Sequence, residues 1–168
     1  MSEVQRLVAE LRPYIADDRV LAAIAAVPRE AFVPPELRPQ AYDNTALGIG
    51  CGQTISQPLV VARMTELLEL HPEDRVLDVG TGSGYHAAVL AALGGQVWSV
   101  ERHPELSASA ERALAEAGIE GVEGLALARR RDVDRVERRL LGQAARAVAD
   151  DQGDVVDAGE PQRLARLA

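Results

Sequence analysis

The chain has 168 residues, of which 47% are hydrophobic, and its formal net charge at pH 7 is −8. This length suits one domain with a real core, and the acidic balance argues against a nucleic-acid surface, which would need a basic face. No apolar run reaches the roughly 18 residues of a membrane helix, and the first residues lack a signal-peptide core. The single cysteine, Cys51, can form neither an internal disulfide nor a metal cluster. We therefore expect a cytoplasmic monomer that binds no metal, membrane or nucleic acid.

Two helices are expected in the first 28 residues. The first is indicated by an apolar stripe formed by Val4, Leu7, Val8 and Leu11. Asp18 can cap the second, which Pro28 ends. Four prolines between residues 28 and 39 then predict an extended loop.

The next stretch predicts a flexible loop followed by a helix. Three glycines lie between residues 48 and 52, and Pro58 falls in the first turn of the helix. Ser56 is placed to be the N-cap of this helix, and spacing alone favours that role.

A strand, a tight turn and a helix are predicted around three alternating glycines. Residues 75–79 form a short apolar run that breaks at Gly80, Gly82 and Gly84 before an alanine-rich helical segment. Glycines allow close backbone approach, and unpaired N–H groups at a helix start favour an electronegative group. A second strand, 96–100, ends at Glu101, whose carboxylate can accept both hydroxyls of a ribose. The turn is therefore a candidate seat for a ribose-containing ligand, and the alternative is a tight turn that binds nothing.

The spacing distinguishes between ribose ligands. A dinucleotide site needs G-x-G-x-x-G, and Tyr85 stands where the third glycine would be. Asp78 followed by G-x-G-x-G and a distal acid resembles motif I of the S-adenosylmethionine-dependent methyltransferases. This resemblance implies that the turn wraps the methionyl part of the cofactor and that Glu101 holds its ribose. The cofactor residues that it implies are Asp78, Gly80, Thr81, Gly82, Ser83, Gly84, Tyr85 and Glu101.

Further segments resemble the protein-L-isoaspartate O-methyltransferase family. They are Val27-Pro28-Arg29-Glu30-x-Phe32-Val33-Pro34, Ala41-Tyr42-x-Asn44, Gly50-x-Gly52-Gln53-Thr54-Ile55-Ser56-Gln57-Pro58, Met64-Thr65-Glu66-Leu67-Leu68 and Val76 to Tyr85. The resemblance covers about residues 20–118, and the loop at 52–56 is more specific than the cofactor turn. It implies that Thr54, Ile55, Ser56 and Gln57 bind the substrate and that Ser56 belongs to the active site. His86 stands where many members have Gln, and a histidine at the surface or behind the site is expected there.

The resemblance implies a doubly wound, mostly parallel sheet of the Rossmann-like class I methyltransferases. We expect a helical segment with the substrate loop at 1–57, a βαβ cofactor core at 58–120, and a divergent helical or disordered tail at 121–168. Beyond about residue 122 the family's further strands are not apparent, and helical spacing over 133–148 and a helical stub near Leu164 are predicted instead. The tail contains no aromatic residue and no lysine. A shifted reading frame in a GC-rich gene would explain the change.

Two functions are therefore compatible with the sequence. In the first, the chain is a protein-repair methyltransferase that moves a methyl group from S-adenosylmethionine to the carboxylate of L-isoaspartyl residues in peptides and proteins. In the second, it is a truncated or frame-shifted, catalytically incomplete fragment, because a ligand crevice needs strands on both sides of the switch point. Methylation of another small acceptor is disfavoured by the loop at 52–56.

Overall fold

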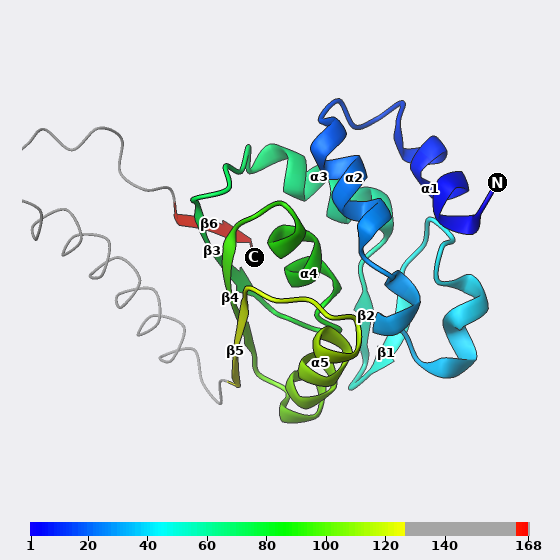
Figure 1. The fold of residues 1–168 in the computed structure, drawn as a ribbon. Coiled ribbons are helices and arrows are strands. Elements are labelled where there is room, and N and C mark those ends of the chain that lie inside the picture. Colours follow the sequence, from blue (N-terminus) through cyan, green and yellow to red (C-terminus); the bar gives the residue numbers. More distant parts are fainter. Residues whose placement is uncertain (127–163, 168) are drawn as a thin grey trace, which may run out of the picture.

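The computed structural model describes residues 1–126 and 164–167 (Figure 1). Its centre is a sheet in the order β5-β4-β3-β6, in which every neighbouring pair of strands is parallel. The strands are β3 (Arg75–Val79), β4 (Gln96–Glu101), β5 (Val122–Ala126) and β6 (Leu164–Leu167). The chain proceeds outward from β3 to β5, and β6 returns to the other side of β3. This reversal places a topological switch point between β3 and β6, where open α/β sheets bind ligands.

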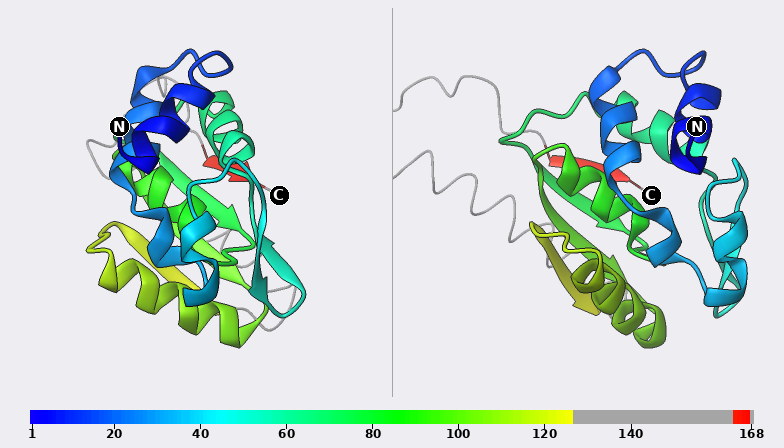
Figure 2. Two further views of the ribbon diagram at one scale, coloured as in Figure 1. Left: turned by 90° about the vertical axis from the view of Figure 1, so that its right-hand side faces the viewer. Right: turned by 45° about the vertical axis from the view of Figure 1, so that its right-hand side comes forward.

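Helices connect the successive strands. α4 (Tyr85–Ala92) joins β3 to β4 and α5 (Pro104–Glu116) joins β4 to β5, and Figures 1 and 2 show both on the same face of the sheet. Two consecutive right-handed crossovers in one direction require this placement. The strand, turn and helix predicted around the three glycines are confirmed, as is the Rossmann-like parallel arrangement.

The first 57 residues form helices and a hairpin. The elements are α1 (Glu3–Leu11), α2 (Asp18–Ala26), the 3-10 helices η1 (Arg29–Phe32) and η2 (Pro35–Gln40), and the antiparallel pair β1 (Leu47–Gly50) and β2 (Gln53–Ile55). α3 (Pro58–Leu67) follows. The two predicted N-terminal helices and the helix after Pro58 are confirmed, although the N-cap of α2 is Asp17 and not Asp18.

Two predictions for this region are wrong. Residues 28–39 do not form an extended loop, because prolines can start short helical turns, where their fixed φ is suitable and their missing N–H costs nothing. The glycine-rich stretch is a β-hairpin instead of a flexible loop. It turns through left-handed backbone at Gly50, Cys51 and Gly52, with φ of 98°, 50° and 67°.

One hydrophobic cluster joins the N-terminal segment to the sheet domain. Its buried members include Leu7 of α1, Ile24 of α2 and Phe32 of η1, together with Tyr85 of α4 and Leu114 of α5. The Phe32 and Tyr85 rings meet edge to face, 5.8 Å between centroids. The N-terminal segment is thus packed directly on α4 and α5. The boundaries at residues 57 and 120 stay predictions.

The C-terminal range contains strands that the pattern of its residues did not predict. β5 pairs with β4, and β6 pairs with β3 in the register Arg75↔Leu164 to Asp78↔Leu167. The helical stub expected near Leu164 is wrong, because the pairing with β3 holds these residues extended, and a contact across about 90 residues leaves no local periodicity. The helix predicted over 133–148 lies outside the described residues.

Candidate active site

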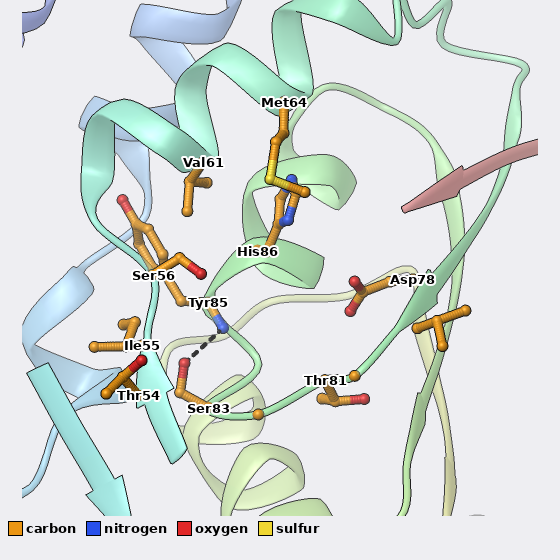
Figure 3. Close-up of a pocket in the computed structure, with 13 residues that line it drawn as sticks. Thr54, Ile55, Ser56, Val61, Met64, Asp78, Thr81, Ser83, Tyr85 and His86 are labelled. Atoms are coloured by element: carbon orange, nitrogen blue, oxygen red, sulfur yellow. Dashed lines mark hydrogen bonds between the residues drawn. The ribbon is translucent and has the colours of Figure 1, made fainter. Parts of the chain in front are cut away.

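A pocket of about 190 Å³ lies at the carboxyl end of β3, between the glycine turn and the β2–α3 segment (Figure 3). Figure 3 shows Thr54 and Ser56 on one side of it, Asp78 and Thr81 on the other, and Met64 and His86 at one end. The lining residues are Thr54, Ile55, Ser56, Val61, Met64, Asp78, Val79, Gly80, Thr81, Gly82, Ser83, Tyr85 and His86. The structure therefore brings together most of the site residues that the sequence predicts, from segments 20 residues or more apart.

Three predicted site residues lie outside this lining: Gln57, Gly84 and Glu101. The Gln57 side chain donates to the Asn44 carbonyl (2.9 Å). Gly84 is buried against α5, where an added Cβ would come within 3.2 Å of the Ala110 Cβ. Gln57 and Gly84 thus contact other parts of the protein and support the segments that form the pocket wall.

The hydroxyl of Ser56 is not used as a helix cap. α3 has Gln57 as its N-cap, without a side-chain capping bond, and the N–H of Leu59 donates to Asn44 Oδ1 (3.0 Å). The capping role predicted for Ser56 is therefore wrong, because Asn44 comes from outside the helix to satisfy the free N–H. Ser56 is exposed and lines the pocket, so its hydroxyl is available to a ligand.

The N–H groups of the glycine turn are engaged within the protein. Gly80 and Thr81 donate to the Val100 carbonyl (2.8 and 3.2 Å), and Gly82 donates to Glu101 Oε2 (2.8 Å). The Gly84 N–H also donates within the turn, to the Thr81 carbonyl (2.8 Å). The expectation of unpaired donors for an electronegative group is therefore wrong for these four positions. A phosphate cradle built from them is excluded in this geometry, because such a cradle needs N–H groups that point at the ligand.

A chain of hydroxyls supports the buried carboxylate at the end of β3. Ser99 Oγ donates to Asp78 Oδ2 (2.6 Å), and Thr81 Oγ1 lies 2.6 Å from Ser99 Oγ. Since Ser99 has one proton and gives it to Asp78, Thr81 donates to Ser99 and keeps its lone pairs. Burial raises the pKa of Asp78. The charge of a protonated His86 and the hydrogen bond from Ser99 act in the opposite direction and limit this rise. This wall presents oxygen acceptors and one carboxyl group, so it suits a cationic ligand.

His86 lies in the pocket wall, and the expected position at the surface or behind the site is wrong. Its Nε2 lies 3.0 Å from Thr65 Oγ1 of α3, and its ring lines the pocket beside Met64 (Figure 3). Burial lowers the pKa of His86, and the nearby Asp78 opposes this effect. His86 is therefore neutral at pH 7. α4 is apolar on all sides, so its helical period gave no signal that residue 86 faces the pocket.

Glu101 holds backbone in the structure. Its Oε2 accepts the Gly82 N–H, and its Oε1 accepts the N–H of His103, the N-cap of α5 (2.9 Å). Each carboxylate oxygen can accept a second bond, so the ribose role predicted for Glu101 stays a prediction. The side chain is buried, with 6% of its surface exposed.

Residues 1–126 and 164–167 contain no cluster of three or more His, Cys, Asp or Glu side chains that could hold a metal ion. They also contain no helix with both the length and the apolar character that crossing a membrane requires.

Comparison with known proteins gives a consistent family. The model of the protein-L-isoaspartate(D-aspartate) O-methyltransferase family matches residues 2–129. A protein-L-isoaspartate O-methyltransferase of Photorhabdus laumondii is 53% identical over 120 residues, which are 71% of this chain and 58% of that protein. One of Sodalis glossinidius is 59% identical over 111 residues, 66% of this chain and 53% of that protein. The chain thus spans about half the length of the curated relatives that it matches.

Solved structures agree in fold. A protein-L-isoaspartate O-methyltransferase aligns with a TM-score of 0.66 at 30% identity, over 73% of this chain and 41% of that one. A proposed member from Plasmodium falciparum, in complex with S-adenosyl-L-homocysteine, aligns with a TM-score of 0.69 at 24% identity, over 84% and 70%. These likenesses confirm the expected class I methyltransferase fold. The pocket and the strand order agree with these matches, and we conclude that the chain belongs to the protein-L-isoaspartate(D-aspartate) O-methyltransferase family.

Proposed function

We propose that the chain transfers a methyl group from S-adenosylmethionine to the free carboxylate of L-isoaspartyl residues in damaged peptides and proteins. The observation that carries this proposal is the juxtaposition in one pocket of the Ser56 loop with the oxygen-lined end of β3. Membership of the family supports the same reaction.

The residues present fit S-adenosylmethionine better than a dinucleotide. The Asp78 carboxyl and the Thr81 lone pairs suit the positive charges of a sulfonium and an ammonium. The N–H groups of Gly80, Thr81, Gly82 and Gly84 already donate within the protein, so they do not serve a pyrophosphate. Asp78, Gly80, Thr81, Gly82, Ser83 and Tyr85 would hold the methionyl end, with Gly84 and Glu101 supporting the turn. When bound, this cofactor supplies an electrophilic methyl group.

The chain's own task is then to position the acceptor. An isoaspartyl carboxylate is already ionised at neutral pH, so no strong base is required. Ser56 and the backbone of Thr54 to Gln57 orient it by hydrogen bonds, and Val61 adds an apolar contact to the wall near Ser56. Holding two reactants in contact supplies much of the rate enhancement in such a displacement.

A methyl-transfer assay on an isoaspartyl peptide and its aspartyl twin tests the function. Ser56→Ala should lower kcat/KM by about tenfold or more, because one oriented hydrogen bond to a charged group is worth roughly 1.5–3 kcal/mol. Binding of S-adenosylhomocysteine, measured by titration calorimetry, should stay within about threefold of wild type because Ser56 lies opposite the turn. Equal loss of both would contradict the role of Ser56.

A second candidate is a catalytically incomplete fragment. The chain's match to only about half of its relatives favours it. So does the pocket, whose 190 Å³ is below the roughly 300 Å³ at which small-molecule pockets begin. β6 argues the other way, since it gives β3 a neighbour on each side and thereby completes the switch point between β3 and β6. If the wild-type chain does not bind S-adenosylhomocysteine, the catalytically incomplete fragment is the better description.

We also propose that the chain acts in the cytoplasm as a monomer and does not bind nucleic acid. The exposed free Cys51 supports a reducing compartment, and the net charge of −8 opposes nucleic-acid binding. Light scattering of the purified chain would test the oligomeric state.

A further inference from the structure

Arg29 of η1 is fully buried, with 0% of its surface exposed, and it lies directly behind the pocket wall. Its Nη2 donates to the Ser56 carbonyl (2.8 Å) and more weakly to the Thr45 carbonyl (3.4 Å). Its guanidinium stacks over the Tyr85 ring, 4.6 Å from the centroid. One side chain therefore connects both ends of the β1–β2 hairpin segment to the start of α4.

Burial of the charged Arg29 guanidinium costs desolvation free energy. Within the described residues no carboxylate is within ion-pair distance of it, and its Nε and Nη1 have no hydrogen-bond partner. Burial lowers the pKa of Arg29, although an arginine stays protonated in proteins. A methionine of similar length would fill the space without this desolvation cost. Packing alone therefore does not account for a guanidinium at this position.

The position of the charge relative to the pocket suggests its use. The Asp78 carboxyl lines the pocket from the end of β3, whereas Arg29 contacts Ser56 and Tyr85, which line it from the loop and from α4. The Glu30 carboxylate, next to Arg29 in the sequence, accepts the Tyr42 hydroxyl, and its charge also acts on Tyr85. Arg29 is the fully buried charge of this pair, and it contacts two residues of the pocket wall. In a poorly solvated site such fixed charges act strongly on ligands.

We propose that Arg29 is a positioning residue for the acceptor: it clamps the Ser56 carbonyl so that the Ser56 hydroxyl faces the pocket, and its charge favours an anionic carboxylate beside that hydroxyl. Asn44 completes the clamp by taking the Leu59 N–H that Ser56 would otherwise cap. The inference rests on the proposed function for its acceptor, but the clamp can be tested without catalysis.

The test compares Arg29→Met, Arg29→Lys and, as the matched control, Arg38→Met at an exposed arginine of η2. Amide hydrogen exchange over residues 45–57 reports the clamp, with β3 and β4 as internal references. Arg29→Met should speed exchange of this segment by about tenfold, since a charge-assisted hydrogen bond to the loop is lost. Arg38→Met should exchange like wild type.

Kinetics with the isoaspartyl peptide report the charge. Arg29→Met should raise KM by about tenfold while the affinity for S-adenosylhomocysteine changes less than about threefold. Arg29→Lys keeps the charge but loses the stack and the reach to two carbonyls. Its KM should therefore be close to that of wild type, while its exchange over residues 45–57 should be as fast as in Arg29→Met. A role in packing alone would not separate these two measurements. If Arg29→Met does not fold, Arg29→Lys carries the comparison.

Three failures are distinguishable. Wild-type exchange over 45–57 in a folded Arg29 variant would overturn the clamp, and equal loss of peptide and cofactor affinity would overturn the acceptor role. A wild-type chain without affinity for S-adenosylhomocysteine would overturn the proposed function instead, whatever the exchange shows.

Discussion

Positive backbone φ angles shape the turn between β3 and α4, and its glycines are not equivalent. Gly80 (φ 97°) has open space where a Cβ would lie, whereas a Cβ on Gly84 (φ 88°) would meet α5 at the Ala110 Cβ. Left-handed backbone costs a residue with a side chain roughly 1–2 kcal/mol, and overpacking adds about 1–3 kcal/mol. Gly80 thus adjoins the pocket, and Gly84 allows α4 and α5 to approach closely.

We therefore expect different results from one substitution at the two positions. Gly84→Ala should lower the free energy of unfolding in urea by about 2–5 kcal/mol, and Gly80→Ala by about 1–2 kcal/mol. Gly80→Ala should also weaken binding of S-adenosylhomocysteine, because the new methyl group points toward open space at the pocket. Equal destabilisation by the two changes would contradict the contact with α5.

His86 should make stability depend on pH below neutrality. Its pKa is lowered in the folded chain, so as pH falls through its ordinary value of 6.5 the unfolded chain takes up a proton that the folded chain refuses. Stability is then lost on acidification. Between pH 7.5 and 5.5 wild type should lose more stability than His86→Gln, by at most about 1.4 kcal/mol because pH 5.5 is one unit below the ordinary value, measured by urea titration. An equal loss in both proteins would show that His86 does not titrate differently on folding.

At the scale of elements, Glu66 of α3 fixes the start of α2. Its Oε1 accepts the N–H groups of Ala16 and Asp17 (2.6 and 2.9 Å), just before the helix begins. The hydrogen bond from the Asp17 backbone N–H is the main cause that lowers the pKa of Glu66. A contact across about 50 residues thus joins the start of α2 to α3.

Glu66→Ala should lower the free energy of unfolding at pH 7 by about 1–3 kcal/mol, since two N–H groups lose a charged acceptor. Because the folded pKa is lowered, this contribution is present above the ordinary value of 4.5 and disappears as pH falls below it. Glu120→Ala, at an exposed acid after α5, is the control and should change stability little. A difference from wild type that persists unchanged at low pH would contradict the charged contact.

For the whole molecule, β6 decides whether the sheet has a switch point. Its pairing with β3 joins the last residues of the chain to the strand that carries Asp78. A parallel strand that is open on one side leaves an unpaired edge and only half of a ligand crevice.

A chain that ends at residue 163 should therefore melt at lower temperature and bind S-adenosylhomocysteine more weakly. Calorimetric titration should show at least about a tenfold loss of affinity, equivalent to ~1.4 kcal/mol. Removal of Ala168 alone is the control. Unchanged affinity in the shorter chain would show that the pocket does not need β6.

Local patterns in the sequence determined the helices α1 to α5, the strands β3 and β4 and the glycine turn, because caps, prolines, glycines and apolar periodicity act over a few residues. They missed the two 3-10 helices and the β1–β2 hairpin. Most of the pocket lining was identified by the family resemblance. Family resemblance, not spacing, identified Ser56. Only the tertiary structure decided that Asn44 caps α3 in its place, that His86 enters the pocket, that Arg29 is buried behind the loop, and that residues 164–167 pair with β3. These features depend on contacts between residues 15 or more positions apart, and burial and hydrogen bonding at that range leave no period in the chain.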